Sequence, residues 1–449
     1  MNKVNLFLIL LIIFTNCSFD NKTGIWTDDS VIKEKVEKEI KAKQSKLKSV
    51  FSGTQIFSEE KSVDLNSNIQ IKNSKKNNDW LDHYFNLSNN VTNISYENKG
   101  DIISKSPKLS RSLISSSFLF YKNNIISYDN KGTIYIYSIP KRTKIFEYNF
   151  YKNQFKKYKK EIFLTIENNF IIASDNLGYI YSININSGKL NWAKNFGIPF
   201  RSNIKVLNSQ IFLANQDNII YSVRTSDGEK NWQFPTSETF IKNEFKNSIA
   251  IDQKKNSLYF FNTSGELYSI NYINKKINWV LNLRNTSASD RSELFSSLPL
   301  VIDDNNILVV NNNLLQNYES FTGSKKWSYP YGASLKPVLN NNYVFILNKN
   351  NLLICLELNT GTVLWSKKIY KQIQTVKPKK IGIIQNIIVA NSRVLLHSSN
   401  GYLLSFNYKN GDLISLKRIT KSFLEKGNPI FVNGYMYAFD KNYKLYQIN

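Results

Sequence analysis

Residues 174–183 read Ser174-Asp-Asn-Leu-Gly-Tyr-Ile-Tyr-Ser-Ile183, and three residues later the chain continues as Ser187-Gly-Lys-Leu-Asn-Trp192. A second copy, Asn262-Thr-Ser-Gly-Glu-Leu-Tyr-Ser-Ile270, leads to Trp279. The tryptophans that end such copies are spaced 40, 47, 48 and 38 residues apart: Trp192, Trp232, Trp279, Trp327 and Trp365. Self-similarity at this period predicts an array of repeated supersecondary units, each burying its apolar face against its neighbours.

Each repeat reads as four short strands. In the second unit, runs of β-branched and aromatic residues at 162–166, 170–174, 179–183 and 189–195 are separated by Asn, Asp and Gly, which supply the positive φ of tight turns. Four antiparallel strands repeated radially form a blade of a β-propeller. The sequence therefore predicts an all-β propeller of four-stranded antiparallel blades.

Most of the tryptophans stand at the same distance after a glycine of the preceding turn. A glycine stands four residues before four of them, namely Gly188, Gly228, Gly323 and Gly361, whereas Lys275 takes this place before Trp279. We expect each tryptophan on the outermost strand of its blade, where a large flat side chain fills the widening gap between neighbouring blades. A structural wedge is the expected role, and stacking against a ligand is the alternative.

The number of blades follows from the outer strands. Seven are recognised, at Phe146, at the five tryptophans and at Ser415, and only three strand-like runs remain after Ser415. The last blade therefore needs a strand from elsewhere, and the apolar alternation at 91–97 offers one. This N-terminal strand would pair with the C-terminal blade, closing the ring and removing an open sheet edge. We predict eight blades over residues 90–449, with seven as the alternative.

The N-terminus is typical of an export signal. Lys3 precedes an apolar run at 4–14, which as a helix rises only about 16 Å against a hydrocarbon core of about 30 Å. The run ends at Cys17, and this ending resembles the lipobox of bacterial lipoproteins, whose cysteine is diacylated and becomes the first mature residue. We expect residues 1–16 to be a signal peptide and Cys17 to be the lipidation site, with a plain signal peptide or an uncleaved anchor as the alternative.

Residues 17–89 are predicted to be a tether. An apolar stripe at Ile32, Val36, Ile40 and Leu47, with charges at helical spacing, predicts a short charged helix. Residues 52–78 are rich in Ser, Asn and Lys and read as a linker. Whether the helix packs on the propeller or a partner, or belongs to a mobile arm, is left open.

Composition narrows the possible functions. The 449 residues carry 59 Lys+Arg and 34 Asp+Glu, a formal net charge of +25, but the lysines are scattered and no nucleic-acid motif accompanies them, so we expect no nucleic-acid partner. Two Cys and two His exclude a Cys/His metal cluster. Cys355 reads as a small buried residue rather than a nucleophile. Because no catalytic motif is found either, we expect no catalytic residue, metal or cofactor.

The repeat itself, Asp-x-x-Gly-x-(Ile/Leu)-x-(Ser/Ala)-(Ile/Leu) followed by Thr/Ser-Gly-x-x-x-Trp, resembles the PQQ-type propeller repeat over residues 78–449. Quinoprotein dehydrogenases and the BamB family of lipoproteins share this repeat. The dehydrogenases have two adjacent cysteines over the cofactor and a carboxylate cluster for calcium at the propeller axis, whereas Cys355 is the only cysteine after Cys17. The combination of lipobox and propeller resembles the BamB family, and Asn78-Asp-Trp80 through Asn86 is similar to the segment before the propeller in its alphaproteobacterial members.

This resemblance implies a non-catalytic lipoprotein subunit of the outer-membrane β-barrel assembly (BAM) complex. Such a subunit would lie on the periplasmic face of the outer membrane, held to the inner leaflet by its lipid anchor. It would bind BamA and other BAM subunits and would aid the folding and insertion of unfolded outer-membrane proteins. A PQQ-dependent quinoprotein dehydrogenase and a generic periplasmic protein-binding propeller are the alternatives.

The resemblance also implies a partner site. The long connectors at 235–247 and 284–299 correspond to the connectors that contact BamA in the family, and both should emerge side by side on one face. The implied partner-binding residues are Phe240, Lys242, Asp290, Arg291, Glu293, Leu294 and Phe295. An apolar pair flanked by charges suits a desolvated anchor with a polar rim. Leu294 or Phe295 could instead cover the end of the propeller, and variable loops without a partner are the simpler alternative.

Overall fold

A computed structural model describes residues 17–19, 26–28, 56–64, 68–152, 155–239, 246–284 and 295–449. The chain divides into two units, residues 1–55 and 56–449. In the first unit, β1 (Cys17–Phe19) pairs antiparallel with β2 (Trp26–Asp28), so that Cys17 lies opposite Asp28. The expected signal peptide and charged helix lie outside the described residues.

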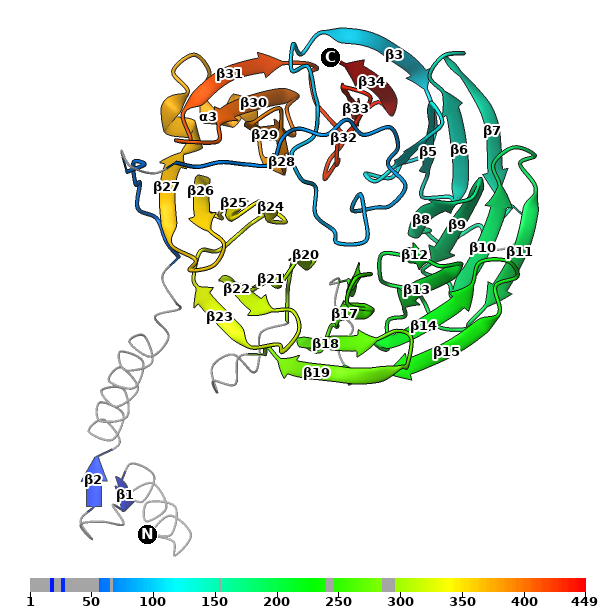
Figure 1. The fold of residues 1–449 in the computed structure, drawn as a ribbon, viewed down its shortest axis with the longest axis horizontal. Helices are drawn as coiled ribbons and strands as arrows, with labels where there is room; N and C mark the ends of the chain where they lie inside the picture. Colours follow the sequence, from blue (N-terminus) through cyan, green and yellow to red (C-terminus); the bar gives the residue numbers. More distant parts are fainter. Residues whose placement is uncertain are drawn as a thin grey trace, which may run out of the picture. The chain divides into compact units, whose positions relative to one another are not determined.

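The second unit is a ring of eight four-stranded antiparallel sheets, which confirms the predicted eight-bladed propeller (Figure 1). Blade 1 consists of β4 (Leu119–Tyr121), β5 (Asn124–Tyr128), β6 (Thr133–Ser138) and β7 (Thr143–Asn149). Blade 2 consists of β8 (Ile162–Glu167), β9 (Phe170–Asp175), β10 (Tyr179–Asn184) and β11 (Leu190–Asn195). Blade 3 consists of β12 (Lys205–Leu207), β13 (Gln210–Ala214), β14 (Ile219–Arg224) and β15 (Lys230–Pro235). Blade 4 consists of β16 (Ser248–Asp252), β17 (Ser257–Phe261), β18 (Glu266–Asn271) and β19 (Lys276–Asn282).

The same order of strands continues around the ring. Blade 5 consists of β20 (Val301–Asp303), β21 (Asn306–Asn311), β22 (Leu314–Glu319) and β23 (Lys325–Tyr329). Blade 6 consists of β24 (Val338–Asn340), β25 (Tyr343–Leu347), β26 (Leu352–Glu357) and β27 (Val363–Lys368). Blade 7 consists of β28 (Ile384–Ala390), β29 (Arg393–Ser398), β30 (Tyr402–Asn407) and β31 (Leu413–Arg418). Blade 8 consists of β32 (Ile430–Val432), β33 (Tyr435–Phe439), β34 (Lys444–Ile448) and β3 (Ile102–Lys108).

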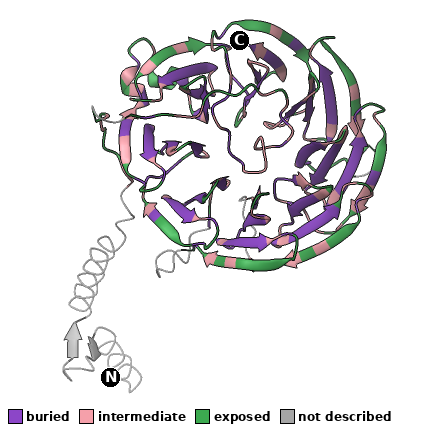
Figure 2. Ribbon diagram, viewed as in Figure 1, coloured by how far each residue is buried: buried purple, intermediate pink, exposed green. Residues whose placement is uncertain are grey.

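The first three strands of each blade carry the core, and the fourth faces solvent (Figure 2). In blade 2, β9 and β10 are buried over most of their length, whereas in β11 only Trp192 is buried and the other residues are exposed or partly covered. Blades stack face to face, so the inner strands are covered on both sides and read as continuous apolar runs rather than as strict alternation. This explains runs such as Leu352–Glu357, in which five of six residues are buried.

The ring closes by pairing an N-terminal strand with the C-terminal blade, but the predicted strand at 91–97 was wrong. The closing strand is β3, which pairs antiparallel with β34, so that Ile102 lies opposite Ile448. Residues 91–97 show apolar alternation because Val91, Ile94 and Tyr96 are buried against the inner strands. As an outer strand, β3 leaves Ile102 and Ile103 about half exposed, and this position gives it a weak apolar pattern.

The tryptophans of the repeat pack against the turn of the next blade. A Cβ added to Gly228 would lie 2.4 Å from the Trp192 ring, and one added to Gly361 would lie 2.6 Å from the Trp327 ring. The Trp192 indole N–H also donates a hydrogen bond to Thr225 O at 2.9 Å, in the same turn. Equivalent bonds join Trp279 to Ser320 O, Trp327 to Leu358 O and Trp365 to Tyr408 O. Each of these four indoles thus links two neighbouring blades through a turn whose glycine leaves room for the ring, whereas the turn of blade 4 that follows Trp232 has Lys275 at this place.

A serine or cysteine faces four of the five tryptophans on the neighbouring strand of the same blade, and Asn317 faces Trp327. Ser182 lies opposite Trp192 and Ser269 opposite Trp279, each next to a β-bulge. Cys355 occupies this position opposite Trp365 and is fully buried. Burial raises the pKa of its thiol well above the usual value, so Cys355 is protonated and packs as a small apolar residue.

Two short helical turns lie in the connector between blades 6 and 7: η2 (Ile369–Gln372) and α3 (Pro378–Ile381). Among the described residues, no helix has the length and hydropathy needed to cross a bilayer.

Candidate functional site

Residues 56–64 and 68–76 run along the propeller before the chain reaches its axis. The Phe57 N–H donates to Pro330 O at 3.0 Å, and Lys61 forms a bridge with Ser366 at the outer strand β27. Ile69 is 2% exposed within the apolar cluster of blades 6 and 7. Residues 56–64 and 68–90 therefore contact the blades, and the division of the chain at residue 90 stays a prediction.

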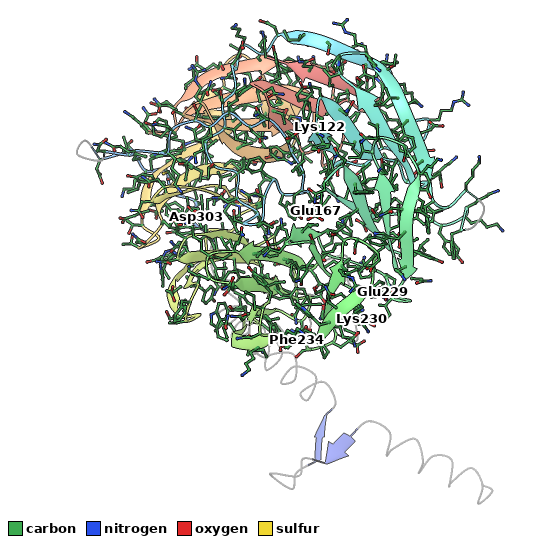
Figure 3. All side chains as sticks on the ribbon, turned by 45° about the vertical axis from the view of Figure 1, so that its right-hand side comes forward. Lys122, Glu167, Glu229, Lys230, Phe234 and Asp303 are labelled. Atoms are coloured by element: carbon green, nitrogen blue, oxygen red, sulfur yellow. The ribbon has the colours of Figure 1, made fainter. Side chains whose placement is uncertain are left out.

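The turns between the first and second strands of the blades surround the axis on one face. Lys122, in this turn of blade 1, and Asp303, the last residue of β20 before this turn of blade 5, are labelled in Figure 3. The Lys122 N–H donates to the Asp79 carboxylate at 3.1 Å, and Lys72 forms an ion pair with Asp303 at 3.4 Å. The segment that precedes the propeller therefore enters the central channel from this face.

Residues 77–97, here called the axial segment, then pass around the inside of the ring (Figure 1). The segment contacts the inner strands in their order around the ring. Trp80 exchanges two backbone hydrogen bonds with Phe120 of blade 1 at 2.8 and 2.9 Å, and Asp82 forms a bridge with Thr165 of blade 2. Later bonds join Leu87 O to Ile251 N of blade 4, Ser88 O to Ile302 N of blade 5, Asn90 to Leu339 of blade 6, Ile94 N to Val389 O of blade 7 and Glu97 N to Gly434 O of blade 8.

Blade 3 is contacted through a buried ion pair. Lys205, at the start of β12, is fully buried and donates to Asp82 Oδ2 at 2.7 Å and to Asn86 O at 2.6 Å. Desolvation lowers the pKa of Lys205 and raises the pKa of Asp82, and the attraction between the two groups opposes both shifts. A buried pair of this kind holds the axial segment in one register, because either charge alone is costly in the interior.

Asparagine side chains complete the fit of the segment. Asn89 Nδ2 donates to Ile249 O at 2.9 Å and to Leu300 O at 3.0 Å, which joins blades 4 and 5.

Lys336 Nζ donates to Asn89 O at 2.6 Å. Burial and the charge of Lys205 lower the pKa of Lys336 to about 7, and burial lowers the pKa of His83 to about 3. The axial segment thus occupies part of the centre of the ring, where Lys205, Asp82 and Lys336 contact one another or the segment.

The predicted partner-binding residues fall mostly outside the described part of the chain. Six of the seven lie outside the described residues: Phe240, Lys242, Asp290, Arg291, Glu293 and Leu294. Phe295 is described, and it is only 4% exposed, with its ring edge-to-face against Phe261 at 5.4 Å. This placement agrees with the alternative that Phe295 covers the end of the propeller.

The bases of the two connectors flank one turn of blade 4, formed by residues 262–265. The Thr239 hydroxyl lies 3.3 Å from the Thr263 hydroxyl on the side of the first connector. On the side of the second connector, the Leu283 N–H donates to Gly265 O at 2.8 Å. The described bases of both connectors therefore lie beside the same turn.

The described residues contain no group of three or more His, Cys, Asp or Glu arranged to hold a metal ion. His397 is buried in β29, 3% exposed, with its ring 4.1 Å from that of Phe423. His83 stacks edge-to-face on Tyr84. These two histidines pack as aromatic residues in separate places.

Sequence reasoning missed the axial segment as a functional element. Its signals are present, because Trp80 precedes a run rich in asparagine, Asn86 and Asn89–Asn90 among them. Asparagine is typical of turns, and its amide also pairs with backbone groups that no strand partner reaches. The run therefore reads as a loop until the inner strands that it contacts are known.

Comparison with known proteins gives a family. A family model described as "Outer membrane protein assembly factor BamB" matches residues 131–367. A curated protein of this name from Yersinia pestis is 21% identical over 302 residues, which cover 62% of this chain and 71% of that protein. Another, from Moranella endobia (strain PCIT), is 21% identical over 269 residues, which cover 55% of this chain and 64% of that protein.

Solved structures share the fold. The crystal structure of BamB from Moraxella catarrhalis superposes with a TM-score of 0.60 at 13% identity, covering 78% of this chain and 99% of that one. A quinohemoprotein alcohol dehydrogenase from Comamonas testosteroni superposes with a TM-score of 0.62 at 9% identity, covering 84% and 81%. At such low sequence identities, the similarity to these two structures shows a shared architecture and nothing about function.

Proposed function

This chain belongs to the BamB family of outer membrane protein assembly factors, and we propose from that premise that it is a non-catalytic scaffold subunit of the BAM complex. In this role it binds BamA and other BAM subunits and aids the folding and insertion of unfolded outer-membrane proteins. The observation that carries the proposal is the match of the family model to residues 131–367, which include most of blades 1 to 6.

A scaffold role agrees with the centre of the molecule. Residues 77–97 run through the channel around which the blades are arranged, and they are fixed there by bonds to the inner strands. The fold shared with a quinohemoprotein dehydrogenase is therefore used here to hold a segment of the same chain at the axis.

The proposed contact surface for BamA is the pair of connectors at 235–247 and 284–299, with Phe240, Lys242, Asp290, Arg291, Glu293 and Leu294 as contact residues. Supporting this, the described bases of both connectors flank the same turn of blade 4. Phe295, which packs on Phe261, would support the second connector from below.

The proposed location is the periplasmic face of the outer membrane, with Cys17 acylated and inserted in the inner leaflet. One acylated terminus that carries more than one chain is sufficient for stable anchoring. Metabolic labelling with palmitate tests this: we expect label on the wild-type chain and none on Cys17→Ser, and equal labelling of the two would contradict the anchor.

The test of the function is co-purification of BamA from detergent-solubilised envelopes. We expect BamA to accompany the wild-type chain, and we expect a charge-reversed variant, Arg291→Glu with Glu293→Arg, to retain at most about a tenth of it, since hot-spot residues cost 2 kcal/mol or more each. Lys141→Glu, on an exposed turn between β6 and β7, is the matched control. Purification of the wild-type chain without BamA under mild conditions would contradict the proposal.

The dehydrogenase alternative has a direct assay. PQQ and calcium are added to the purified chain, and dye-linked oxidation of alcohols and sugars is followed. We expect no turnover above the rate without protein, and turnover that depends on PQQ would replace the scaffold proposal.

A further inference from the structure

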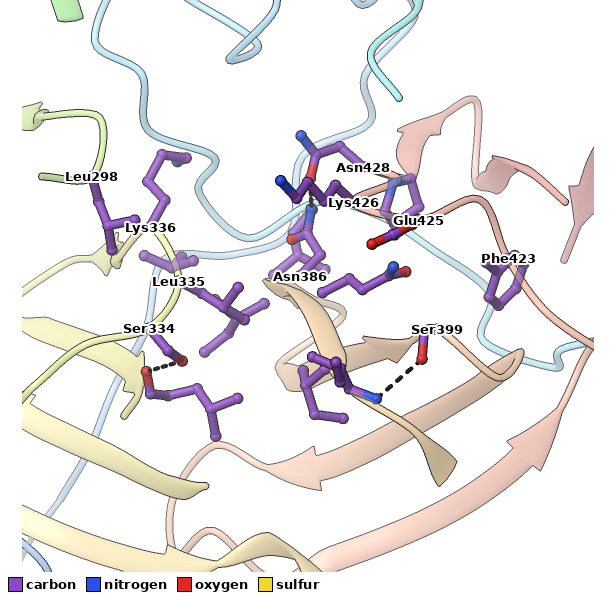
Figure 4. Close-up of a pocket in the computed structure, with 18 of the residues that line it drawn as sticks. Leu298, Ser334, Leu335, Lys336, Asn386, Ser399, Phe423, Glu425, Lys426 and Asn428 are labelled. Atoms are coloured by element: carbon purple, nitrogen blue, oxygen red, sulfur yellow. Dashed lines mark hydrogen bonds between the residues drawn. The ribbon is translucent and has the colours of Figure 1, made fainter. Parts of the chain in front are cut away.

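A cavity of about 1000 Å³ lies beside the axial segment at the inner ends of blades 5 to 8. Its walls come from the connectors that precede β20, β24, β28 and β32, and from the turns that follow β25, β29 and β33. Trp80, His83, Tyr84 and Val91 of the axial segment line it from the centre of the ring. We call this cavity the axial pocket (Figure 4). Its volume is at the upper end of the range for ligand sites.

Aliphatic side chains form much of the wall of the axial pocket. Leu335, Leu347, Ile384 and Ile387 line it, and Phe423 closes the side next to blade 8. Ile383, at the pocket, is 77% exposed, which is unusual for an isoleucine. These residues can cover the apolar side chains of a ligand.

Cations outnumber anions in the wall. Lys336, Lys349, Lys426 and Lys441 line the axial pocket, and Glu425 is the acidic residue among the lining residues. In Figure 4 Lys336 lies on one side of the cavity, and Glu425 and Lys426 lie on the other. Lys336 is the innermost cation, since it contacts the axial segment at Asn89 O. An ammonium group has three donors, and the described residues give Lys336 only this one bond, so donors remain for a ligand.

One amide oxygen and one hydroxyl in the wall lack partners in the described part of the chain, whereas Asn348, Asn386, Asn400 and Asn428 already make side-chain hydrogen bonds. Gln385 Oε1 and Ser422 Oγ are buried atoms with no hydrogen-bond partner among the described residues, and both residues line the pocket. Further amide side chains at the pocket are those of Asn348, Asn351, Asn386, Asn400 and Asn428. Amide and hydroxyl groups in this number can pair with the N–H and C=O groups of a peptide backbone.

We propose that the axial pocket binds the C-terminal end of an extended polypeptide, with aliphatic side chains against Leu335, Leu347 and Ile384 and the terminal carboxylate on Lys336. The proposal rests on the proposed function for the source of such a chain, an unfolded protein on its way to the membrane. The carboxylate places one negative charge where the pocket has an excess of lysines, and a charge-assisted hydrogen bond to an ammonium is among the stronger ones.

The chemistry of the wall favours a peptide over a fatty acid. A fatty acid also offers a carboxylate and an apolar body, but its acyl chain has no hydrogen-bonding groups. It would leave Gln385 Oε1 and Ser422 Oγ buried without partners, which costs free energy for each group. A peptide can satisfy these atoms and fill the apolar wall at the same time.

The test uses the full chain in detergent and a fluorescein-labelled hexapeptide of alternating leucine and serine with a free carboxylate. Fluorescence anisotropy gives the dissociation constant. We expect this peptide to bind at least about tenfold more tightly than the same peptide with a C-terminal amide, because the amide removes the charge. Lys336→Met should reduce binding of the acid peptide to the level of the amide peptide, while Lys141→Met, on an exposed turn, should leave it unchanged.

A second pocket variant tests the proposal independently in case Lys336→Met misfolds. Ser334 is exposed and lines the pocket, so Ser334→Trp should fill the cavity and abolish binding of the peptide, at the cost of the hydrogen bond from the Ser334 hydroxyl to Leu347 O. Equal binding of acid and amide peptides, unchanged binding by either pocket variant, or displacement of the peptide by dodecanoate at lower concentration than by unlabelled peptide would each overturn the proposal. Because BamA is absent from this assay, its failure leaves the co-purification result untouched, and the reverse also holds.

Discussion

His397 illustrates how a single buried group sets a pH limit on stability. The ring is 3% exposed, both of its nitrogens lack partners among the described residues, and burial lowers its pKa to about 3. The unfolded chain takes up a proton at this histidine near pH 6.5, whereas the folded chain does so only near pH 3. Folding stability is therefore lost as the pH falls through that window.

We predict that His397→Leu reduces this loss. Between pH 7 and pH 4.5 the variant should lose about 2 to 3 kcal/mol less than the wild type, since each pH unit below 6.5 is worth about 1.4 kcal/mol for one proton. Urea unfolding at both pH values measures the difference. His83, whose pKa is also lowered to about 3, keeps part of the slope in the variant. The same slope in both proteins would show that His397 accepts a proton in the folded state.

Gly228 and Gly197 allow two effects of a glycine substitution to be measured separately: backbone strain at positive φ, and collision of the new Cβ with a neighbouring side chain. Both have positive φ, 75° and 77°. A Cβ at Gly228 would collide with the Trp192 ring, whereas a Cβ at Gly197 has no atom within 4 Å.

We predict that Gly197→Ala destabilises the fold by about 1 kcal/mol through backbone strain alone. Gly228→Ala should cost about 2 to 4 kcal/mol, since the ring must also move and strain its neighbours. Chemical denaturation of the two variants gives the values. Equal losses would mean that Trp192 yields without cost.

At the scale of elements, the ion pair between Lys205 and Asp82 fixes the axial segment to blade 3. We predict that Lys205→Met destabilises the chain by about 3 to 5 kcal/mol, because it leaves the Asp82 carboxylate buried without its cation. Adding Asp82→Asn to this variant should restore most of the loss, since no charge then remains to be buried. Thermal and urea unfolding of the wild type, the single variant and the double variant provide the comparison.

A control at the surface shows what burial contributes. Arg224 and Asp227 form an exposed pair at 2.7 Å, and Arg224→Met should change stability by less than about 1 kcal/mol. If Lys205→Met behaved like Arg224→Met, the axial segment would not depend on the buried pair.

The strands of the blades could be predicted well from sequence, and the closing strand could not. In the second unit the expected runs at 162–166, 170–174 and 179–183 differ by one residue from β8, β9 and β10. These strands are covered on both faces, so their apolar runs are strong. The outer strand β3 is covered on one face only, and residues 91–97 imitate a strand because they are buried at the axis.

At the scale of the whole molecule, the ring depends on its N-terminal third. Residues 77–97 contact the inner strands of all eight blades, and β3 completes blade 8. We predict that removal of residues 1–55 leaves the unfolding midpoint within about 3 °C of the full chain, because residues 56–449 form one unit.

Removal of residues 1–110 should have a different result. It exposes β34 as an open edge and empties the channel, so we expect loss of a single cooperative transition and the appearance of oligomers. Thermal unfolding and light scattering compare the two truncations. A monomeric, cooperative product of the longer truncation would contradict a role for the axial segment in closure.

The candidate site was predictable only in outline. The lengths of the two connectors, seen in the spacings of 47 and 48 around Trp279, indicated which loops differ from the others. The axial pocket was not foreseen, because its wall gathers residues as far apart as Trp80 and Lys441, which only the closed ring brings together. No local pattern encodes such a set.

The pairing of β3 with β34 also affects the order in which the chain folds. The strand at residues 102–108 is synthesised early, yet its partner at residues 444–448 lies at the opposite terminus. Closing so long a loop is entropically costly and slow, so we expect the ring to close after the individual blades have formed. Until that pairing forms, β3 and β34 each present an open strand edge, to which a strand of another molecule can bind.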